Sequence, residues 1–395
     1  MNALHNINTP FYLYDLDLFD RTLDAVTNEA NKYGYIVHYA LKANNQKPLV
    51  ERIISRGLGA DCVSGDEVAA ALQHGCSPDM VVFAGVGKTD SEIMLALDNE
   101  IYCLNCESVE ELAVISELAE KAGNVAHVAL RVNPDVDAET HRNITTGRDE
   151  NKFGIHLMHL QEALDFCRNS EYLNFMGLHF HIGSQIISSK PFALLCERVN
   201  HIWNEFRIEE YGATMLNLGG GLGIDYNNPE ENPIPDFNLF FNLFATNLNL
   251  PKHISVHFEL GRSIVGQAAK LITKVLFVKK GINKQFVITD AGMTELLRPA
   301  LYQAVHKISN LSSQGVTGKY DVVGPACESS DVFATELLLP ETKRGDLLAI
   351  HSCGAYAQSM SLHYNLREKA PAYYIHNGIL YSEDSPLELL QPIIV

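Results

Sequence analysis

Residues 35–75 read YIVHYALKANNQKPLVERIISRGLGADCVSGDEVAAALQHG, and this stretch contains two consecutive strand–helix units. Its apolar runs at Tyr35–Leu41 and Gly59–Val63 are short and bounded by glycine or polar residues, which is typical of buried strands. The segment SGDEVAAALQHG at residues 64–75 opens with a serine and early acidic residues. It then spaces its apolar residues by three and four, which predicts a helix.

The alternation of strands and helices continues to about residue 260. Further helix-like segments are SVEELAVISELAEKAG at residues 108–123 and LMHLQEALDFCRNS at residues 157–170. Eight such units in about 225 residues match the size of a parallel (β/α)8 barrel. An open doubly wound sheet is the alternative, but eight successive units without a dinucleotide-binding glycine fingerprint favour a closed barrel. The expected strands are Tyr35–Leu41, Gly59–Val63, Val81–Ala84, Ile101–Leu104, His127–Val132, Phe175–His181, Met215–Leu218 and Ser255–Phe258.

The pattern changes at about residue 270, where strand-like segments follow one another with few helical stretches. They are TKVLFVKK (273–280), KQFVITDAG (284–292), YDVVGPAC (320–327), GDLLAIHS (345–352) and APAYYIHNGILY (370–381). The strand-like FYLYD at residues 11–15 is expected to join them. A chain of this length usually forms two domains. We therefore expect an α/β fold with a (β/α)8 barrel over residues 30–270 and a mainly β domain made of residues 1–29 and 271–395.

Composition narrows the function classes. The 395 residues carry a formal net charge of −18, which argues against nucleic acid or an anionic membrane as a partner. No run of about 18 apolar residues predicts a membrane span, and the first residues do not resemble a signal peptide. Eight scattered cysteines are too few for a disulfide scaffold and suit a reducing cytoplasm. We expect a cytoplasmic protein.

Polar residues or glycines stand at the ends of four of the expected strands, where a barrel builds its active site. Lys42 ends the first strand (HYALKAN), His181 the sixth (HFHIGSQ), Gly219–Gly221 the seventh (NLGGGLG) and Glu259 the eighth (HFELGR). Taken singly, Lys42 reads better as a solvated lysine and His181 as a structural histidine. A glycine run lets backbone N–H groups approach an anion, however, and a buried Glu259 needs a cation.

Pyridoxal phosphate is a single cofactor that meets all four demands. It needs a lysine for its aldehyde, a cradle for its phosphate, a flat group against its ring and a carboxylate facing its pyridine nitrogen. An ionised Glu259 would favour the protonated nitrogen and strengthen the ring as an electron sink. We therefore expect a pyridoxal 5'-phosphate enzyme built around Lys42.

Seven ordered motifs resemble the alanine-racemase-type (fold-type III) decarboxylases that use pyridoxal phosphate. They are HYALKAN (38–44), HIGSQI (181–186), NLGGGLGIDY (217–226), ELGR (259–262), RPALY (298–302), GPACESSD (324–331) and GAYAQSMS (354–361). The resemblance runs from YLYD at residue 12 to near residue 356, and within these enzymes it is strongest to the diaminopimelate decarboxylases. It implies decarboxylation of the small-molecule substrate meso-2,6-diaminopimelate to L-lysine and CO2, the last step of lysine biosynthesis.

The resemblance also implies a role for each matching residue. Lys42 would form the Schiff base with the cofactor, and Cys327 would protonate the substrate's Cα. Cys327 and Glu328 would reach the site from a partner subunit, which implies a homodimer with shared active sites. The other cofactor-binding residues would be His181, Ser184, Gly219, Gly220, Gly221, Glu259, Gly261, Arg262 and Tyr356. The substrate-binding residues would be Arg262, Arg298, Tyr302, Glu328 and Tyr356.

Arg262, Arg298 and Glu328 favour diaminopimelate over a substrate that yields a diamine. A substrate such as ornithine has no distal carboxylate, so its site needs only an acidic group at the far end. Arginine binds carboxylate with two parallel hydrogen bonds, which suits a substrate with amino and carboxyl groups at both ends. Ornithine-type relatives also carry aspartate where this chain has Glu328.

One departure from the family pattern and several alternatives remain. The family commonly has EPGR where residues 259–262 read ELGR, so the loop lacks a proline that would fix φ. A racemase of this fold would set an arginine, not Glu259, against the ring nitrogen. A carboxynorspermidine decarboxylase is disfavoured by Arg298. An inactive, partner-binding protein would typically lack Lys42, the glycines or Cys327.

Other cysteines and histidines are expected to be structural. Cys103 and Cys106 have the spacing of a redox or zinc pair, but no second pair follows them. The sixteen histidines show no metal-like cluster, and no metal site is expected. His38, His127 and His257 fall inside expected strands, where packing in the barrel interior is the better interpretation.

Overall fold

The structure is a computed structural model that describes residues 4–136 and 152–382. These residues fold into two compact units. The barrel unit comprises Leu23–Gly223 and Asp236–Gly261. The β-rich unit comprises the described residues before Leu23, the segment Ile224–Pro235 and the described residues from Arg262 onward.

The barrel unit contains a closed sheet of eight parallel strands, which confirms the predicted (β/α)8 architecture. The strands are β2 (Ile36–Ala40), β3 (Gly59–Cys62), β4 (Val81–Phe83), β5 (Cys103–Cys106), β6 (Ala126–Arg131), β7 (Leu173–His179), β8 (Met215–Asn217) and β9 (Ser255–Leu260). Closure is made by β2 and β9, which pair from Ile36 opposite His257 to Tyr39 opposite Leu260. Leu260 of the ELGR segment is thus a fully buried residue of β9.

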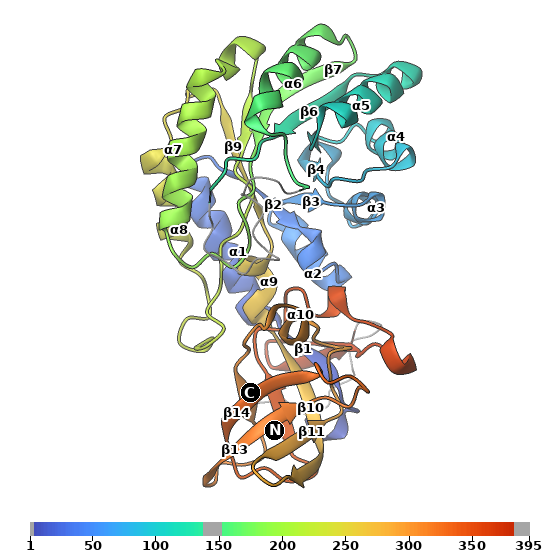
Figure 1. The fold of residues 1–395 in the computed structure, drawn as a ribbon, viewed down its shortest axis with the longest axis vertical. Coiled ribbons are helices and arrows are strands. Elements are labelled where there is room, and N and C mark those ends of the chain that lie inside the picture. The colour runs from blue at the N-terminus through green and yellow to red at the C-terminus, as the bar shows by residue number, and fades with distance from the viewer. Residues whose placement is uncertain (1–3, 137–151, 383–395) are drawn as a thin grey trace. The chain divides into compact units, whose positions relative to one another are not determined.

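One helix precedes the first barrel strand, others follow the strands, and together they cover the outside of the sheet (Figure 1). The helices of the barrel are α1 (Leu16–Asn31), α2 (Lys47–Ser55), α3 (Gly65–Gln73), α4 (Asp90–Asp98), α5 (Val109–Ala122), α6 (Leu157–Asn169), α7 (Lys190–Glu205) and α8 (Phe237–Asn247). Side-chain caps fix where several of them begin. Ser64 caps α3, Ser108 caps α5, and Thr89 forms a capping box with Glu92 at α4.

All eight predicted strands overlap observed ones, with shifted ends. β5 begins two residues later than predicted. The Ile101 N–H donates to the Ala96 carbonyl at the end of α4, so this residue belongs to the helix end and not to the strand. His181 lies two residues beyond β7 instead of within it. The interior position predicted for His127 was wrong: its side chain is exposed, because alternation along β6 buries the residues on either side of it.

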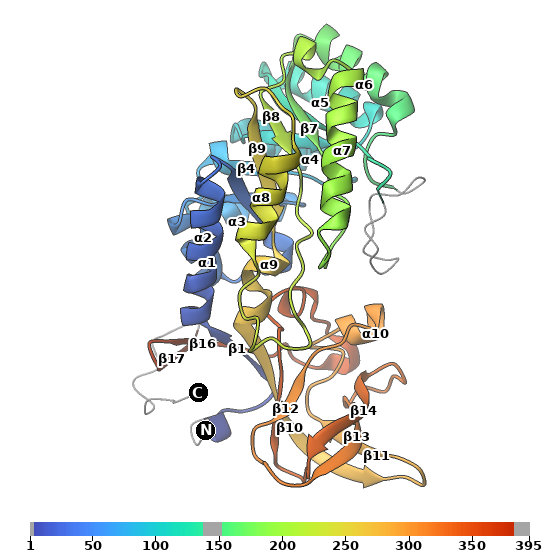
Figure 2. The same cartoon turned by 90° about the vertical axis from the view of Figure 1, so that its left-hand side faces the viewer.

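Alternation along β9 sets the direction of the residues that matter for the site. Phe258 packs against α8, with ring centroids 4.9 Å from Phe244 and 5.1 Å from Phe241. The ribbons of β9 and α8, which carry these residues, are labelled in Figure 2. Since neighbouring side chains of a strand point to opposite faces, His257 and Glu259 point into the barrel, where both are buried. Packing of phenylalanines outside the barrel thus fixes a carboxylate inside it.

The β-rich unit is built on a nine-stranded sheet with the order β14-β13-β11-β10-β1-β16-β17, with β15 also paired with β10 and β12 with β15. The strands are β1 (Phe11–Asp15), β10 (Ala269–Lys280), β11 (Gln285–Thr289), β12 (Ile308–Asn310), β13 (Thr317–Val323), β14 (Val332–Pro340), β15 (Leu347–Ile350), β16 (Ala372–His376) and β17 (Ile379–Ser382). This confirms the predicted mainly β domain, including the N-terminal strand. Its short helices are α9 (Arg262–Val265) and α10 (Arg298–Tyr302).

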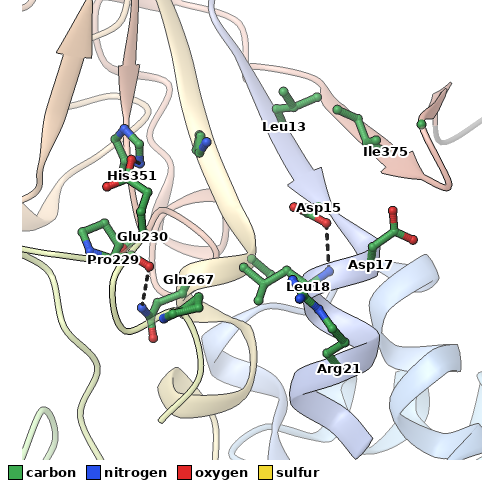
Figure 3. Close-up of a pocket in the computed structure, with 15 residues that line it drawn as sticks. Leu13, Asp15, Asp17, Leu18, Arg21, Pro229, Glu230, Gln267, His351 and Ile375 are labelled. Carbon is green, nitrogen blue, oxygen red and sulfur yellow. Dashed lines mark hydrogen bonds and ion pairs between the residues drawn. The ribbon is translucent and has the colours of Figure 1, made fainter. Parts of the chain in front are cut away.

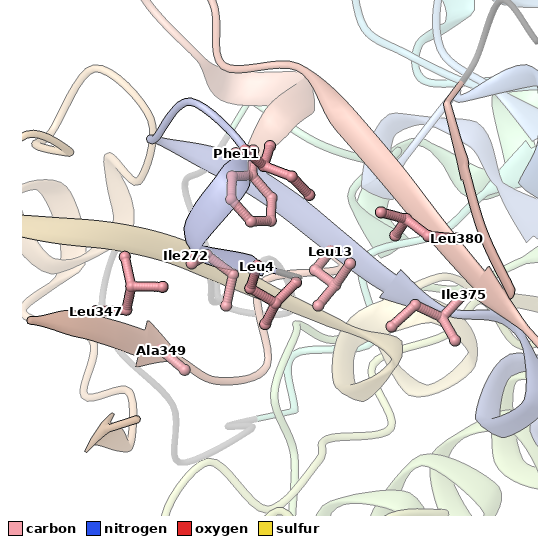
Figure 4. Packing of buried hydrophobic residues seen from close by; sticks show 9 residues of the cluster. Leu4, Phe11, Leu13, Ile272, Leu347, Ala349, Ile375 and Leu380 are labelled. Carbon is pink, nitrogen blue, oxygen red and sulfur yellow. The ribbon is translucent and has the colours of Figure 1, made fainter. Parts of the chain in front are cut away.

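β1 occupies the middle of this sheet. It pairs antiparallel with β10, Phe11 opposite Ile272, and parallel with β16, Tyr12 opposite Ala372. Side chains from both ends of the chain therefore share one core, shown in Figure 4. The buried cluster consists of Leu4, Ile7, Phe11, Leu13, Ile272, Leu347, Ala349, Ile375 and Leu380.

Candidate active site

Glu259 is a buried carboxylate held by three other strands of the barrel. Its Oε1 accepts hydrogen bonds from Asn217 Nδ2 on β8 at 2.7 Å and from Asn105 Nδ2 on β5 at 3.1 Å. Its Oε2 accepts one from His179 Nε2 on β7 at 3.1 Å. Burial raises the pKa of Glu259, but the charge and hydrogen bond of His179 and the charge of Lys42 outweigh it and hold that pKa well below its ordinary value. Glu259 therefore stays ionised.

Lys42 lies just after β2 and pairs with a residue of β3. Its Nζ is 2.6 Å from Oδ2 of Asp61, whose side chain is fully buried, while the lysine side chain is 35% exposed. Burial and the charge of Glu259 raise the pKa of Asp61 to about 7, although Lys42 acts in the opposite direction. Asp61 can therefore gain or lose a proton near neutral pH.

The glycines after β8 form a loop that side chains would obstruct. Gly219 and Gly221 have φ of 65° and 101°, which favour glycine. A Cβ at Gly220 would lie 1.9 Å from the carbonyl oxygen of Glu259, so the loop could not keep its path. The loop therefore consists of backbone without side chains, as a cradle for an anionic group requires.

His181 contacts this glycine loop. The Gly220 N–H donates to His181 Nδ1 at 3.2 Å, so Nδ1 must be unprotonated. Burial, with the charges of Arg131 and Lys42, lowers the pKa of His181 to about 3, which leaves a neutral ring. Ser184 follows three residues later, in the segment where the Ile186 N–H donates to the Gly221 carbonyl at 2.8 Å. His181, Ser184 and the glycines are therefore adjacent.

These residues of the barrel unit fit pyridoxal phosphate. They supply a primary amine, a loop of backbone without side chains, a neutral flat ring and a buried ionised carboxylate, which are the four groups that the cofactor needs. Gly261 belongs to the same end of the barrel: a Cβ there would lie 3.0 Å from Cβ of Ala43, next to Lys42.

The β-rich unit contributes a separate cluster around two buried arginines. Arg262 and Arg298 are 5% and 4% exposed, and their guanidinium carbons lie 5.9 and 4.7 Å from the ring centre of Tyr226. Arg262 donates to the Tyr226 hydroxyl at 2.7 Å and also lies 4.8 Å from the ring centre of Tyr356. Within residues 4–136 and 152–382, no carboxylate lies within ion-pair distance of Arg298. A buried cation of this kind is suited to an anionic ligand.

Cys327 and Glu328 are exposed on a loop between β13 and β14. The loop is held from inside by Asp331, whose carboxylate accepts the N–H of Met293 at 2.6 Å and of Ala326 at 2.7 Å. The Cys327 N–H donates to Asn365 Oδ1 at 3.0 Å. The loop therefore presents both side chains outward. Tyr302 is half-buried at the end of α10.

Several residues of these clusters were not predicted. Asp61, Asn105 and Asn217 are polar residues inside short, otherwise apolar barrel strands, and that position is the signal which could have indicated them. Tyr226 was quoted in NLGGGLGIDY without a role. His306 donates to the backbone and contacts Arg298, and no local pattern marks it.

A cavity of about 450 Å³ lies in the β-rich unit between the start of α1 and the Pro229–Pro233 segment (Figure 3). None of the predicted site residues lines it, so we assign it no part in the chemistry. Among the described residues, no group of three or more His, Cys, Asp or Glu side chains could hold a metal ion. No helix in the described part of the chain is long and apolar enough to cross a membrane.

Comparisons with known proteins show the family to which the chain belongs. Residues 17–266 match the sequence model of a family described as pyridoxal-dependent decarboxylase, pyridoxal binding domain. The chain is 48% identical over 374 residues to a diaminopimelate decarboxylase of Bacteroides thetaiotaomicron, which covers 94% of this chain and 97% of that one. The crystal structure of Helicobacter pylori diaminopimelate decarboxylase complexed with L-lysine is similar, with a TM-score of 0.91, 37% identity and coverage of 97% and 95%.

Proposed function

The chain belongs to the pyridoxal-dependent decarboxylases, in the diaminopimelate decarboxylase family, and we propose on that basis how it converts meso-diaminopimelate to L-lysine and CO2 in lysine biosynthesis. The observation that carries the chemistry is Glu259, a buried carboxylate that stays ionised in the same barrel end as Lys42. A decarboxylase needs this negative charge, because it keeps a pyridine nitrogen protonated.

Bound in the barrel unit, pyridoxal phosphate supplies an electron sink for the pair of electrons that the departing carboxylate leaves on Cα. Lys42 would hold it covalently, Ser184 and the loop of Gly219–Gly221 would hold the phosphate, and the neutral ring of His181 would lie against the cofactor ring. Gly261 keeps the end of β9 close to Lys42. Glu259 would face the pyridine nitrogen, in the position fixed by His179 and the two asparagines.

Lys42 must lose a proton before its amine can react, and Asp61 would accept it. The two side chains are 2.6 Å apart, and the pKa of Asp61, raised to about 7 by burial, matches a proton acceptor that works near neutral pH. Lys42 Nζ would give up its proton to Asp61 Oδ2 each time its amine has to react.

The β-rich unit would bind the substrate. Arg298 offers a buried guanidinium with no carboxylate partner in the described residues, which suits the distal carboxylate of diaminopimelate. Arg262, whose guanidinium carbon lies 4.8 Å from the ring centre of Tyr356, would bind the carboxylates together with Tyr356 and Tyr302. Arg262 and Tyr356 would also bind the cofactor on the side of its phosphate. Glu328 would bind the distal ammonium group.

Cys327 would protonate Cα after CO2 has left, from the partner subunit of a homodimer. Its thiol is exposed on a loop that Asp331 anchors, a position suited to completing the site of another subunit. Two inactive variants, Lys42→Ala and Cys327→Ala, should regain activity when their subunits are mixed, because a mixed dimer contains one intact site. Mixtures that stay inactive although mixed dimers form would overturn the shared site.

All eight cysteines are free thiols, seven of them buried, and this supports a reducing compartment. We therefore place the enzyme in the cytoplasm. Fractionation of the native cells with an antibody against the chain would test this, and recovery from an extracytoplasmic fraction would refute it.

The function is tested by substrate choice. Purified protein with pyridoxal phosphate should release CO2 from meso-diaminopimelate and not from ornithine, arginine or lysine. Lys42→Ala should lose the visible absorbance of the bound cofactor, whereas the control Lys47→Ala, an exposed lysine paired with Glu51, should keep it. Release of CO2 from ornithine but not from diaminopimelate would overturn the substrate assignment. An unchanged spectrum in Lys42→Ala would overturn the role of that lysine.

A further inference from the structure

His306 in the β-rich unit uses both ring nitrogens in hydrogen bonds. It is 3% exposed and lies two residues before β12. Its Nδ1 is 2.9 Å from the backbone oxygen of His351, and its Nε2 is 2.8 Å from Nη1 of Arg298. The backbone around it is fixed as well, because the His351 N–H donates to the Lys307 carbonyl at 2.9 Å.

The two partners determine which nitrogen carries the proton. A backbone oxygen only accepts hydrogen bonds, so Nδ1 must be the donor to His351. A guanidinium only donates, so Nε2 must be unprotonated and accept from Arg298. The ring is therefore neutral and in a single tautomer. Burial and the charge of Arg298 lower the pKa of His306 to about 3, which agrees with this assignment.

Apart from the hydrogen bond to His306, the contacts around Arg298 do little to fix the orientation of its guanidinium group. The Tyr226 ring lies edge-on to His306, with centroids 4.8 Å apart, and Arg298 lies over the same tyrosine at 4.7 Å. Arg262 adds a second positive charge near His306, and Cys353 Sγ lies 4.0 Å from His306 Nδ1. Stacking limits the tilt of the guanidinium but leaves it free to turn within its plane. With no carboxylate paired to Arg298 in the described chain, the hydrogen bond that Arg298 donates to His306 sets that rotation.

We propose that His306 is a positioning residue for substrate recognition: its neutral ring accepts a hydrogen bond from Nη1 of Arg298 and so turns the remaining guanidinium donors toward the carboxylate that the product retains. This inference rests on the proposed function, in which Arg298 binds the distal carboxylate of the substrate. Two parallel hydrogen bonds to a carboxylate require a fixed guanidinium plane. His306 would act through Arg298 and would not touch the reacting atoms.

Two substitutions separate the acceptor of His306 from its donor. Glutamine can place its Oε1 near the position of Nε2, which keeps an acceptor for Arg298. Asparagine can place its Nδ2 near Nδ1, which keeps the bond to the His351 carbonyl but removes the acceptor. We expect His306→Asn to raise the KM for diaminopimelate about 10- to 100-fold, the worth of one hydrogen bond to a charged group, with a much smaller change in kcat. His306→Gln should keep a KM within about threefold of the wild type, which is within the variation expected for a retained hydrogen bond.

Binding of two probes gives a readout that does not depend on turnover. L-lysine carries the carboxylate assigned to Arg298, and 1,5-diaminopentane lacks it. In calorimetric titrations of the holoenzyme, His306→Asn should weaken the binding of L-lysine by the same factor by which it raises KM. The affinity for 1,5-diaminopentane should stay unchanged. Equal weakening of both ligands, or of neither, would overturn the proposal. If His306→Asn does not fold, a large loss of lysine affinity in folded His306→Gln would overturn it instead, and retained affinity supports it.

A double-mutant cycle distinguishes positioning from a general structural role. In an Arg298→Ala background, His306→Asn should have no further effect on KM, because the residue through which it acts is gone. Additive effects would overturn the inference. If the wild type itself does not decarboxylate diaminopimelate, the proposed function fails, and this outcome is distinct from a failure of His306 in an active enzyme.

Discussion

Replacing Glu259 with glutamine tests the central electrostatic feature of the barrel unit. The substitution keeps the shape of the side chain and removes its charge. Glutamine Oε1 can still accept from Asn105 and Asn217, which now bond to Glu259 Oε1 at 3.1 and 2.7 Å. The new amide group, however, takes the position of Oε2 and presents N–H groups to His179 Nε2, which now donates there at 3.1 Å.

The effect on stability is expected to be small because two terms oppose each other. Losing the charge-assisted bond to His179 and weakening those to the asparagines costs about 4 kcal/mol in total, at about 2 kcal/mol for a bond to a charged group and half that for a neutral one. Relief from burying a carboxylate returns several kcal/mol. The free energy of unfolding should therefore change by less than about 2 kcal/mol, which is a few degrees in Tm.

The effect on turnover is expected to be large. A charge-assisted hydrogen bond contributes up to about 3 kcal/mol, and each 1.36 kcal/mol is tenfold in rate, so kcat should fall by about 100-fold or more. Thermal unfolding of the cofactor-free protein and steady-state CO2 release from the holoenzyme measure the two quantities. Glu259→Asp, which keeps the charge, should retain more activity than Glu259→Gln. A glutamine variant with normal kcat, or one whose activity falls only in proportion to lost folded protein, would refute the reasoning.

Three further predictions follow from other features. Gly220→Ala should lower the affinity for pyridoxal phosphate and destabilise the barrel unit, since its Cβ would lie 1.9 Å from a carbonyl oxygen. The control Gly87→Ala, whose Cβ would have no atom within 4 Å, should change neither the stability nor the affinity, which a fluorescence titration measures. Burial and the charge of His38 lower the pKa of His257 to about 3 from 6.5, so its neutral ring stabilises the fold fully above pH 6.5 and loses that contribution as the pH falls toward 3. The free energy of unfolding in urea should be roughly 2 kcal/mol lower at about pH 5 than above pH 6.5 because of this residue. If His257→Gln lost as much stability over the same pH range, the prediction would be contradicted. Cys327→Ala should lower kcat about 100-fold or more while cofactor absorbance stays unchanged, and an unaffected kcat would exclude the thiol as the proton donor.

Much of the barrel could be predicted from sequence because its strands are short apolar runs separated by capped helices. Ser64 and Ser108 mark helix starts in the sequence as plainly as in the structure. The residues at strand ends, such as Lys42 and Glu259, could also be predicted, since position at the carboxyl end of a barrel strand is a local property. His127 shows the limit: an apolar run does not reveal which of its alternating positions faces inward.

The partners of the site residues could not be predicted, because they depend on register between strands. Asp61 meets Lys42 across 19 residues, and Asn105 meets Glu259 across 154. Each of these polar residues reads locally as an interruption of an apolar strand. Only closure of the sheet brings Asn105, His179 and Asn217 around one carboxylate. Arg298 and His306 are close in sequence, but their contact depends on the left-handed turn at Gln303. Glutamine is not a common turn residue, so the sequence does not predict this turn.

The central place of β1 has a consequence for how the protein is made. Residues 11–15 leave the ribosome well before residues 269–272 and 372–375, with which they pair. The barrel unit ends at Gly261, so its sheet can be completed before the strands that pair with β1 have been synthesised. During that interval β1 is an unpaired apolar strand, and such edges promote aggregation. Synthesis that stalls between residues 261 and 372 should therefore leave a folded barrel with an exposed, aggregation-prone strand, and we expect chaperones to be needed most at that stage.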